Sequence, residues 1–313
     1  MQEKTWPGHY SPRDIEILES IPQWLAENGY SQAALARLSR IGESTMSQIM
    51  NGTYTSPPGN LLVQVEFAMS NKDKADGLVV PTVSTSVLRL AETACDMARA
   101  NRNFSVLSGY VGTGKTFGIR HYAATYPNTY LFEANPTMTA QSLIRLFARR
   151  IAKYEHGSAA DKFDAVVSCL KGTNGLIIMD EAETLTGKQL HTIRRLRDIA
   201  GVGVVLSGTE HLSGIIRPEH GVLDQIRSRV GFWPETVYRI SGPDCAALTQ
   251  AAFGAEEVRE DVVERLYAYC KGSARMLVEG LIAAVKKFRK ERDLDVLLVD
   301  SVAKKALNLQ SIA

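Results

Sequence analysis

Apolar residues in the middle of the chain gather into short uninterrupted runs that alternate with helical patterns. Four such runs predict strands at residues 104–109, 129–136, 175–183 and 202–210. Amphipathic spacing predicts helices between and before them, as in residues 86–101 and 140–154. Strands without polar alternation are buried on both faces, as in a parallel sheet covered by helices. Residues 84–240 are therefore predicted to form an α/β domain.

Helical patterns flank this domain on both sides. Residues 1–70 read as short helices, the first starting at Ser11-Pro12 and stopping at Asn28-Gly29. The pattern is lost over residues 71–83, which we interpret as a linker. Residues 241–313 carry no strand signal and are predicted to form a small helical C-terminal subdomain.

The composition is that of an ordinary globular chain. Its 313 residues suffice for a large core, and the net charge of +2 restricts any nucleic-acid contact to local basic patches. The four cysteines are far apart in the sequence and are interpreted as reduced core thiols. No apolar run is long enough for a signal peptide or a membrane span, so we expect a cytoplasmic protein.

A phosphate-binding loop is predicted at residues 109–116, "GYVGTGKT", between a strand and a helix. In the pattern G-x-x-x-x-G-K-[ST], glycines let backbone N–H groups surround phosphates at the positive end of the following helix. Lys115 would neutralise the β- and γ-phosphates of ATP, and the Thr116 hydroxyl would bind Mg²⁺. The residues expected to contact the nucleotide are Gly109, Gly112, Thr113, Gly114, Lys115 and Thr116.

An acidic pair follows the third predicted strand, where "LIIMDEAE" contains Asp180 and Glu181, 65 residues or more after Lys115. A carboxylate at the C-terminal end of a strand lies at the crevice where open α/β sheets bind ligands. We expect Asp180 to hold Mg²⁺ and Glu181 to orient or deprotonate the attacking water. The loop and the acidic pair together predict ATP and Mg²⁺ as cofactors.

Further polar residues are candidates for contact with the γ-phosphate. Ser207 and Thr209 end the fourth predicted strand, and Thr209 is preferred as the group that contacts the phosphate or the water. Arg227 and Arg229 in "IRSR" are either catalytic or ordinary surface arginines. Arg275 in "GSAR" starts a helix of the C-terminal subdomain, from which it could reach back to the nucleotide.

These motifs resemble those of the AAA+ ATPases. The "GYVGTGKT" loop is similar to Walker A, "LIIMDE" to Walker B, Thr209 to sensor 1 and Arg275 to sensor 2. The "IRSR" segment is similar to the arginine-finger region, which in this superfamily reaches the nucleotide of a neighbouring subunit. The resemblance therefore implies a P-loop fold, hydrolysis of ATP to ADP and phosphate, and a homo-oligomer, either a ring or a helical filament, in which Arg227 or Arg229 acts in trans.

The order of the domains adds a narrower resemblance. A helical N-terminal domain, a linker and a compact AAA+ module are arranged as in the ATP-dependent target-selection proteins of Mu-type transposing bacteriophages. This resemblance implies two partners: double-stranded DNA, bound largely independently of sequence, and a transposase.

The N-terminal stretch "QAALARLSRIGESTMSQIMNG" resembles the helix-turn-helix of phage repressors. Arg40 stands where a glycine is expected in the turn, so the sequence departs from that pattern. We expect Arg37 and Arg40 to contact phosphates, and Ser44 and Gln48 to hydrogen-bond base edges or phosphates. The alternative is a small bundle that docks a protein.

Basic clusters within the α/β domain offer a second DNA surface. Arg145 and Arg149 share one helix face, and Arg194 and Arg197 share another, with Arg150, Lys153 and Arg195 nearby in the sequence. In an oligomer such faces could follow a DNA backbone, with strong dependence on salt concentration. The run "KKFRKER" at residues 286–292 is a further candidate, for DNA or for an acidic partner.

Two functions are consistent with these features. The first is an ATP-dependent DNA-binding protein that oligomerises on duplex DNA, selects or delivers target DNA and stimulates a transposase. The second is a protein-directed AAA+ switch, such as a replication helicase loader or a signalling ATPase, in which DNA contact is incidental. ATP-dependent binding to random-sequence duplex favours the first, and ATPase activity that is indifferent to DNA favours the second.

Overall fold

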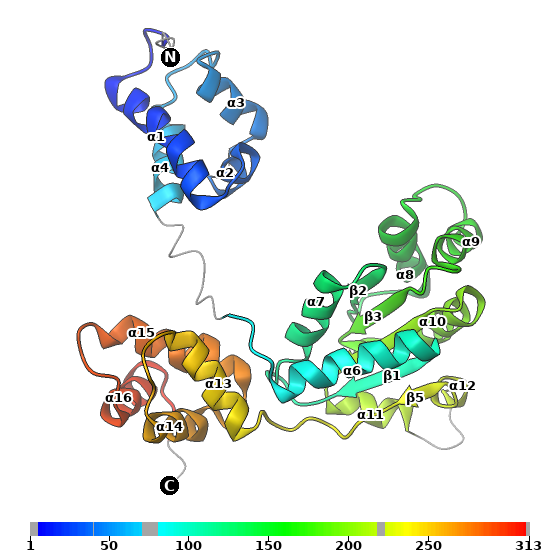
Figure 1. Cartoon of the computed structure of the whole chain (residues 1–313). Helices are drawn as coiled ribbons and strands as arrows, with labels where there is room; N and C mark the ends of the chain where they lie inside the picture. The colour runs from blue at the N-terminus through cyan, green and yellow to red at the C-terminus, as the bar shows by residue number, and fades with distance from the viewer. Residues whose placement is uncertain (1–5, 40, 71–80, 218–222, 311–313) are drawn as a thin grey trace. The chain divides into compact units, whose positions relative to one another are not determined.

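The computed structural model of the chain describes residues 6–39, 41–70, 81–217 and 223–310. The chain divides into two units, residues 1–79 and residues 80–313. Helices alone are found in the described part of the first unit, and a helix-covered sheet forms the centre of the second (Figure 1). Most of the predicted linker falls on residues 71–80, which lie outside the described residues.

Local signals in the sequence start and stop the first helix of the N-terminal unit. The Ser11 hydroxyl accepts a hydrogen bond from the N–H of Asp14 at 3.2 Å, and the Asp14 carboxylate accepts one from the N–H of Ser11 at 2.9 Å. Gly29 ends the helix in the left-handed conformation, with φ of 66°. The predicted start and stop are thus confirmed. The described helices of this unit are α1 (Pro12–Asn28), α2 (Gln32–Leu38), α3 (Glu43–Asn51) and α4 (Gly59–Ser70).

A parallel sheet organises the described part of the larger unit. Its order is β2-β3-β4-β1-β5, and its strands are β1 (Phe104–Ser108), β2 (Thr129–Glu133), β3 (Leu176–Asp180), β4 (Gly203–Gly208) and β5 (Val230–Phe232). The first four lie within the apolar runs of the sequence, which confirms the predicted parallel sheet. The sequence pattern does not predict β5, because three partly exposed residues at an edge are too short for a periodicity.

Helices cover both faces of this sheet (Figure 1). On one face, Leu107 and Val205 pack in a core with residues of α6 and α7. On the other face, Val106 and Leu206 pack in a core with residues of α8 to α12. Neighbouring positions of a strand therefore enter different cores, which explains why the runs are apolar without alternation. The helices are α6 (Ser86–Asn101), α7 (Lys115–Thr125), α8 (Ala140–Phe147), η1 (Ala148–Ala152), α9 (Ala159–Leu170), η2 (Ala182–Thr184), α10 (Gly187–Ala200), α11 (Glu210–Ile216) and α12 (Asp224–Arg227).

The end of the chain folds as helices that contact the sheet-containing part. The carboxylate of Asp244, at the start of α13, accepts hydrogen bonds from the N–H and hydroxyl of Ser86 at 2.8 and 2.5 Å, which ties this region to the start of α6. No strand occurs among the described residues from 241 to 310. The helices are α13 (Gly242–Phe253), α14 (Glu260–Cys270), η3 (Met276–Ile282), α15 (Ala283–Arg289) and α16 (Val296–Ala306).

One of the four cysteines differs from the expectation. Cys95, Cys245 and Cys270 are buried free thiols, but Cys169 is exposed, so the prediction of a core thiol is wrong there. Cys169 lies near the end of α9, whose buried side chains include Val166 and Leu170 on another side of the helix. Across the described part of the chain, none of the helices combines the length and the apolar character that crossing a bilayer requires.

A close approach between α6 and β4 generates a stability prediction. A Cβ atom added to Gly203 would lie 2.5 Å from the carbonyl oxygen of Ala98 and 2.8 Å from the backbone nitrogen of Arg99. Because backbone atoms cannot move aside as a flexible side chain can, Gly203→Ala should lower the free energy of unfolding by about 1–3 kcal/mol. Gly214→Ala is the matched control, since nothing lies within 4 Å of its added Cβ. Urea denaturation of both variants checks this, and equal stabilities would contradict it.

Candidate functional site

The loop between β1 and α7 has the backbone shape that a phosphate cradle requires. Gly112 and Gly114 have φ angles of 81° and 103°, a left-handed region that favours glycine. Gly114 is also the N-cap of α7, and it supplies no side-chain hydrogen bond to the first turn. The backbone N–H groups at the start of α7 therefore need partners other than a capping side chain, and an anion is a favourable one.

Lys115 lies within this loop rather than extending into solvent. Its side chain is buried, and its Nζ donates hydrogen bonds to the carbonyl oxygens of Gly109 at 2.7 Å and Tyr110 at 2.9 Å. Burial lowers the pKa of Lys115, while the carboxylate of Asp180 opposes this effect. An ammonium group has three hydrogens, so one remains for a phosphate oxygen in the loop.

Asp180 is held by hydroxyl groups from two other elements. The Thr116 hydroxyl donates to Asp180 Oδ2 at 2.8 Å, and the buried Ser207 hydroxyl donates to Asp180 Oδ1 at 2.9 Å. The structure thus brings together Thr116 and Asp180, the two residues expected to hold Mg²⁺. A hydroxyl and a carboxylate oxygen are ligands that suit this cation. No group of three or more His, Cys, Asp or Glu residues that could hold a metal ion is found among the described residues.

Ser207 and Thr209, at the end of β4, have different surroundings. Ser207 contacts Asp180, whereas the Thr209 hydroxyl is buried and has no hydrogen-bond partner in the structure. The unpartnered hydroxyl of Thr209 is available for the predicted contact with the γ-phosphate or the water. The strand register explains this contact. Met179 of β3 pairs with Leu206 of β4, so the residues that follow them, Asp180 and Ser207, are also neighbours.

Glu181 has an unusual backbone conformation for a residue other than glycine. Its φ and ψ are 54° and 35°, in the left-handed region. Such conformations cost free energy and occur often at functional sites. Partial burial raises the pKa of Glu181, and the negative charges of Glu133, Asp180 and Glu183 raise it further. A carboxylate with a raised pKa is a stronger base, as proton removal from water requires.

Glu183 is a residue of the site that the sequence reasoning did not single out. Its Oε2 atom is buried and has no hydrogen-bond partner in the structure. It lies against Gly208, where an added Cβ would be 2.1 Å from that oxygen. Glu183 therefore packs directly on the backbone that connects Ser207 to Thr209. The sequence "DEAE" shows a third acidic residue close to the end of the strand, but it does not predict that this residue contacts β4.

The C-terminal helices contact the phosphate loop directly. The backbone N–H of Arg275 donates to the carbonyl oxygen of Gly112 at 3.0 Å, and a Cβ added to Gly112 would meet the Ser273 hydroxyl at 2.4 Å. Arg275, just before η3, is thus brought next to the loop. The segment after β5 also contacts it, since the N–H of Val237 donates to Ser108 O at 2.9 Å and the N–H of Tyr110 donates to Val237 O at 2.7 Å.

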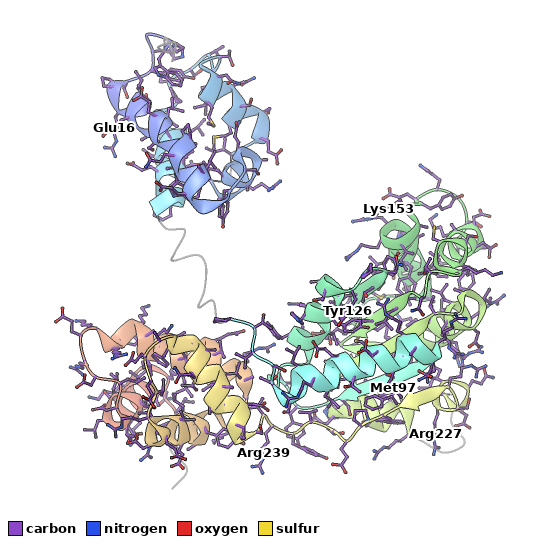
Figure 2. The ribbon with its side chains drawn as sticks, viewed as in Figure 1. Glu16, Met97, Tyr126, Lys153, Arg227 and Arg239 are labelled. Carbon is purple, nitrogen blue, oxygen red and sulfur yellow. The ribbon has the colours of Figure 1, made fainter. Side chains whose placement is uncertain are left out.

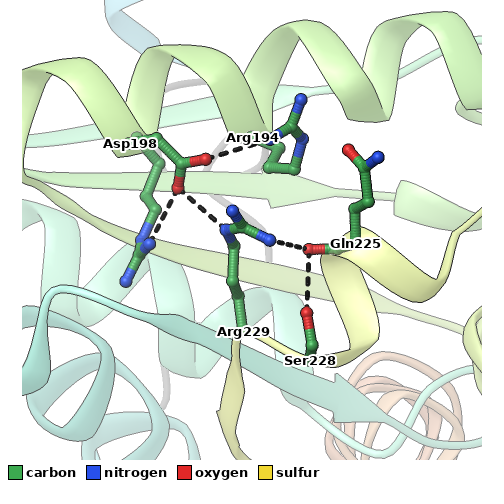
Figure 3. A network of polar contacts seen from close by, with 6 residues as sticks. Arg194, Asp198, Gln225, Ser228 and Arg229 are labelled. Carbon is green, nitrogen blue, oxygen red and sulfur yellow. Dashed lines mark hydrogen bonds and ion pairs between the residues drawn. The ribbon is translucent and has the colours of Figure 1, made fainter.

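Three arginines from two parts of the sequence converge on Asp198 (Figure 3). Arg194 and Arg197 donate to the Asp198 carboxylate at 3.0 and 2.8 Å. Arg229 donates to it through Nε at 3.0 Å, and through Nη1 to the carbonyl oxygen of Gln225 at 2.6 Å. Burial raises the pKa of Asp198, but hydrogen bonds from Arg197 and Arg229 outweigh it and hold the pKa below its usual range.

This cluster includes two residues of one predicted DNA surface, Arg194 and Arg197. The side chains of Arg194 and Arg197 are only 22% and 20% exposed. They are paired with Asp198, rather than directed freely into solvent. Arg227 is the last residue of α12.

The other basic face remains exposed. Arg145 at the end of α8 and Arg149 in η1 are both exposed, and Arg149 lies 4.0 Å from the carboxylate of Glu155. Lys153 follows η1, and Figure 2 shows it well separated from Arg227 on the surface of the unit. The structure therefore does not bring Lys153 together with Arg227.

The predicted DNA-binding residues of the N-terminal unit are also exposed. Ser44 and Gln48 lie one turn apart on α3. Arg37 on α2 donates to the Glu43 carboxylate at 2.9 Å, in a pair whose side chains are 68% and 57% exposed. Arg40 lies outside the described residues. DNA contact by this unit stays a prediction.

Comparison with known proteins finds one matching domain family and several similar proteins. An AAA domain family matches residues 98–216. The chain is 28% identical over 221 residues to the Mu-like prophage FluMu DNA transposition protein B of Haemophilus influenzae, covering 66% of this chain and 75% of that protein. It is 23% identical over 192 residues to the ATP-dependent target DNA activator B of Escherichia phage Mu, covering 59% of this chain and 60% of that protein.

Solved structures share the fold at low sequence identity. The ORC2 protein of Aeropyrum pernix is 17% identical with a TM-score of 0.51, covering 74% of this chain and 70% of that one. A mutant of RuvB from Thermotoga maritima is 16% identical with a TM-score of 0.50, covering 70% and 68%. These similarities and the parallel sheet identify the fold as that of the AAA+ P-loop proteins.

The unequal contacts of Ser207 and Thr209 generate a second prediction. Ser207→Ala should lower the free energy of unfolding by about 1–3 kcal/mol, because it removes a buried hydrogen bond to a carboxylate. Thr209→Val is the matched control, because it removes a hydroxyl that bonds to nothing in the structure and keeps the shape of the side chain. Urea denaturation compares the two, and an equal loss in Thr209→Val would contradict the assignment.

The acidic surroundings of Glu181 generate a prediction about its ionisation. Glu133→Gln should lower the pKa of Glu181, because it removes the carboxylate whose negative charge raises that pKa most among the three. The Glu181 carboxyl would then deprotonate at a lower pH than in the natural chain. Carbon-13 NMR titration of the carboxyl groups measures this. Glu155→Gln, at an exposed glutamate beside Arg149, is the control and should leave the titration unchanged.

Proposed function

Because the chain carries an AAA domain in an AAA+ P-loop fold, we propose that it is an ATPase that assembles on duplex DNA and presents it to a transposase. The observation that carries the enzymatic part is the contact of Thr116 with Asp180 beside the loop of Lys115. The names of the relatives, a DNA transposition protein and a target DNA activator, support the remainder.

The residues of the loop suit Mg²⁺ and the phosphates of ATP. Backbone N–H groups from Gly109 to Thr116 would surround the phosphates, and Lys115 would donate its remaining hydrogen to a phosphate oxygen. Thr116 and Asp180 would hold the cation, which when bound neutralises charge on the phosphate oxygens. Arg275, next to Gly112, would add a second positive charge from the C-terminal helices.

Glu181 is proposed to orient the attacking water and accept its proton. Its raised pKa and its exposure at the end of β3 support this role. Thr209, whose hydroxyl lacks a partner, would contact the water or the γ-phosphate. Ser207 would act as a positioning residue, because its hydroxyl holds the Asp180 carboxylate.

Hydrolysis is proposed to depend on assembly. Arg227 and Arg229 are the candidates for an arginine that reaches the nucleotide of a neighbouring subunit. Such an arginine contributes about 10³ to 10⁵ in rate in related nucleotide hydrolases. Arg229 is held by Asp198 and by the Gln225 carbonyl, so reaching a neighbour would require part of that cluster to rearrange.

DNA is proposed to bind through the exposed basic face of α8 and η1. Arg145 and Arg149 are exposed and share this face, with Lys153 following. Contacts of this kind with phosphates are nearly independent of base sequence and weaken steeply with salt. Arg194 and Arg197 would contribute only by giving up contacts with Asp198.

Electron microscopy with random-sequence duplex DNA tests the proposal. Rings or filaments should form on DNA with a non-hydrolysable ATP analogue and be absent with ADP. Lys115→Ala should abolish nucleotide binding and assembly. Glu181→Gln should bind ATP but hydrolyse it at least about 100-fold more slowly, so that assemblies persist with ATP itself.

The controls separate DNA binding from the ATPase. Arg145→Ala combined with Arg149→Ala should weaken assembly on DNA and leave ATP affinity unchanged, whereas Arg120→Ala, at an exposed arginine paired with Glu133, should change neither. The proposal would be refuted if no particles bound DNA in any nucleotide state and if DNA did not change the ATPase rate. They would favour the protein-directed switch instead.

A further inference from the structure

The N-terminal unit carries a net negative charge. Residues 1–70 contain seven acidic and four basic residues, a net charge of −3. The other 243 residues contain 27 acidic and 32 basic residues, a net charge of +5. Surfaces that bind DNA are positively charged, because they replace the counterions of the phosphates. The charge of the N-terminal unit therefore favours a basic partner.

The acidic residues are not scattered over this unit. Glu16, Glu19 and Glu27 are exposed on α1 at spacings that place them, with Gln23, along one face of the helix. Ile17 and Ile21, on the opposite side of α1, are buried in the core of the unit. The glutamates thus form a stripe on the solvent face of α1, where Figure 2 labels Glu16.

Exposed apolar side chains lie on the helix packed beside α1. Val63 and Phe67, four residues apart on α4, are 52% and 69% exposed. The Arg13 guanidinium on α1 donates to the Glu66 carboxylate on α4 at 3.1 Å, so the two helices lie side by side at this level. The acidic stripe of α1 and the apolar pair of α4 are therefore neighbouring parts of one surface, which we call the α1/α4 surface.

A segment with the complementary character occurs at the end of α15. Residues 286–293 carry five basic and two acidic residues, a net charge of +3. Lys286, Lys287 and Lys290 are exposed, and Phe288 among them is 49% exposed. Arg289 is paired with Glu256 at 2.5 Å, which anchors this segment to the loop between α13 and α14. We call residues 286–293 the basic segment.

We propose that the α1/α4 surface of one copy of this chain docks on the basic segment of a second copy. Glu16, Glu19 and Glu27 face lysines of the partner copy, and Phe67 and Val63 cover its exposed Phe288. Each side has an exposed aromatic side chain, and the α1/α4 surface is acidic where the basic segment is positively charged, so the two are complementary in charge. Exposed charge pairs are weakened by salt, so the contact is strongest at low ionic strength.

This contact is independent of the nucleotide. None of its residues lies in the phosphate loop or at the ends of β3 and β4. It links copies of the chain before ATP or DNA is added, and so differs from the ATP-dependent assembly proposed above. The two proposals can fail separately. The contact between copies is measured without nucleotide and DNA, whereas the ATP-dependent assembly requires both.

Charge reversal in the full-length chain tests the proposal. One variant carries Glu16→Lys, Glu19→Lys and Glu27→Lys, and a second carries Lys287→Glu and Lys290→Glu. Sedimentation velocity at low ionic strength, without nucleotide or DNA, should show each variant alone associating at least about tenfold more weakly than the natural chain, because like charges then face each other. An equimolar mixture of the two variants should associate again, since opposite charges meet between different chains.

Further variants identify the occupant. Asp164→Lys combined with Lys171→Glu reverses other exposed charges and should leave association unchanged. Phe67→Ser should weaken association and leave the affinity for duplex DNA unchanged. The proposal is overturned if the mixture of charge-reversed chains does not associate. It is equally overturned if Phe67→Ser lowers DNA affinity while self-association persists, which would make DNA the occupant of this surface.

Discussion

The parallel pairing of β1, β3 and β4 is the constraint on which the candidate site depends. Ser108 pairs with Gly208, and Met179 pairs with Leu206, so three strand ends meet at one edge of the sheet. The loop after β1 and the carboxylate at the end of β3 therefore lie at the same end of the sheet with β4 between them, and Ser207 reaches that carboxylate from β4. A shift of one residue in this register would turn Ser207 to the opposite face of the sheet.

The Asp198 cluster illustrates how one carboxylate can serve several arginines with different expected roles. Arg194 and Arg197 belong to a helix face predicted for DNA, and Arg229 belongs to a segment predicted to reach a neighbouring nucleotide. Because the carboxylate is shared, a new partner for one arginine changes the electrostatic environment of the other two. Three guanidinium groups with one counterion also leave an excess of positive charge, which an anion would reduce.

The two units of the chain differ in their electrostatics as well as in their folds. The larger unit contains the phosphate loop and the exposed basic face of α8 and η1, both suited to phosphates. The N-terminal unit has acidic residues on its exposed helix and an ion pair between Arg37 and Glu43 beside the helix predicted to contact DNA. The resemblance of residues 32–52 to a helix-turn-helix is one of sequence, and binding of DNA also depends on the charge that the unit presents.

Features that depend on neighbours in the sequence were determined by the sequence itself. The cap at Ser11, the stop at Gly29, the apolar strands and the loop around Lys115 all arise from hydrogen bonds or burial patterns within a few residues. Tertiary structure alone decided the short strand β5, the exposure of Cys169, the contact of Ser207 with Asp180 and the convergence of arginines on Asp198. Ser207 and Asp180, and likewise Arg229 and Asp198, lie far apart along the chain, and only the packing of the sheet and its helices brings them within bonding distance.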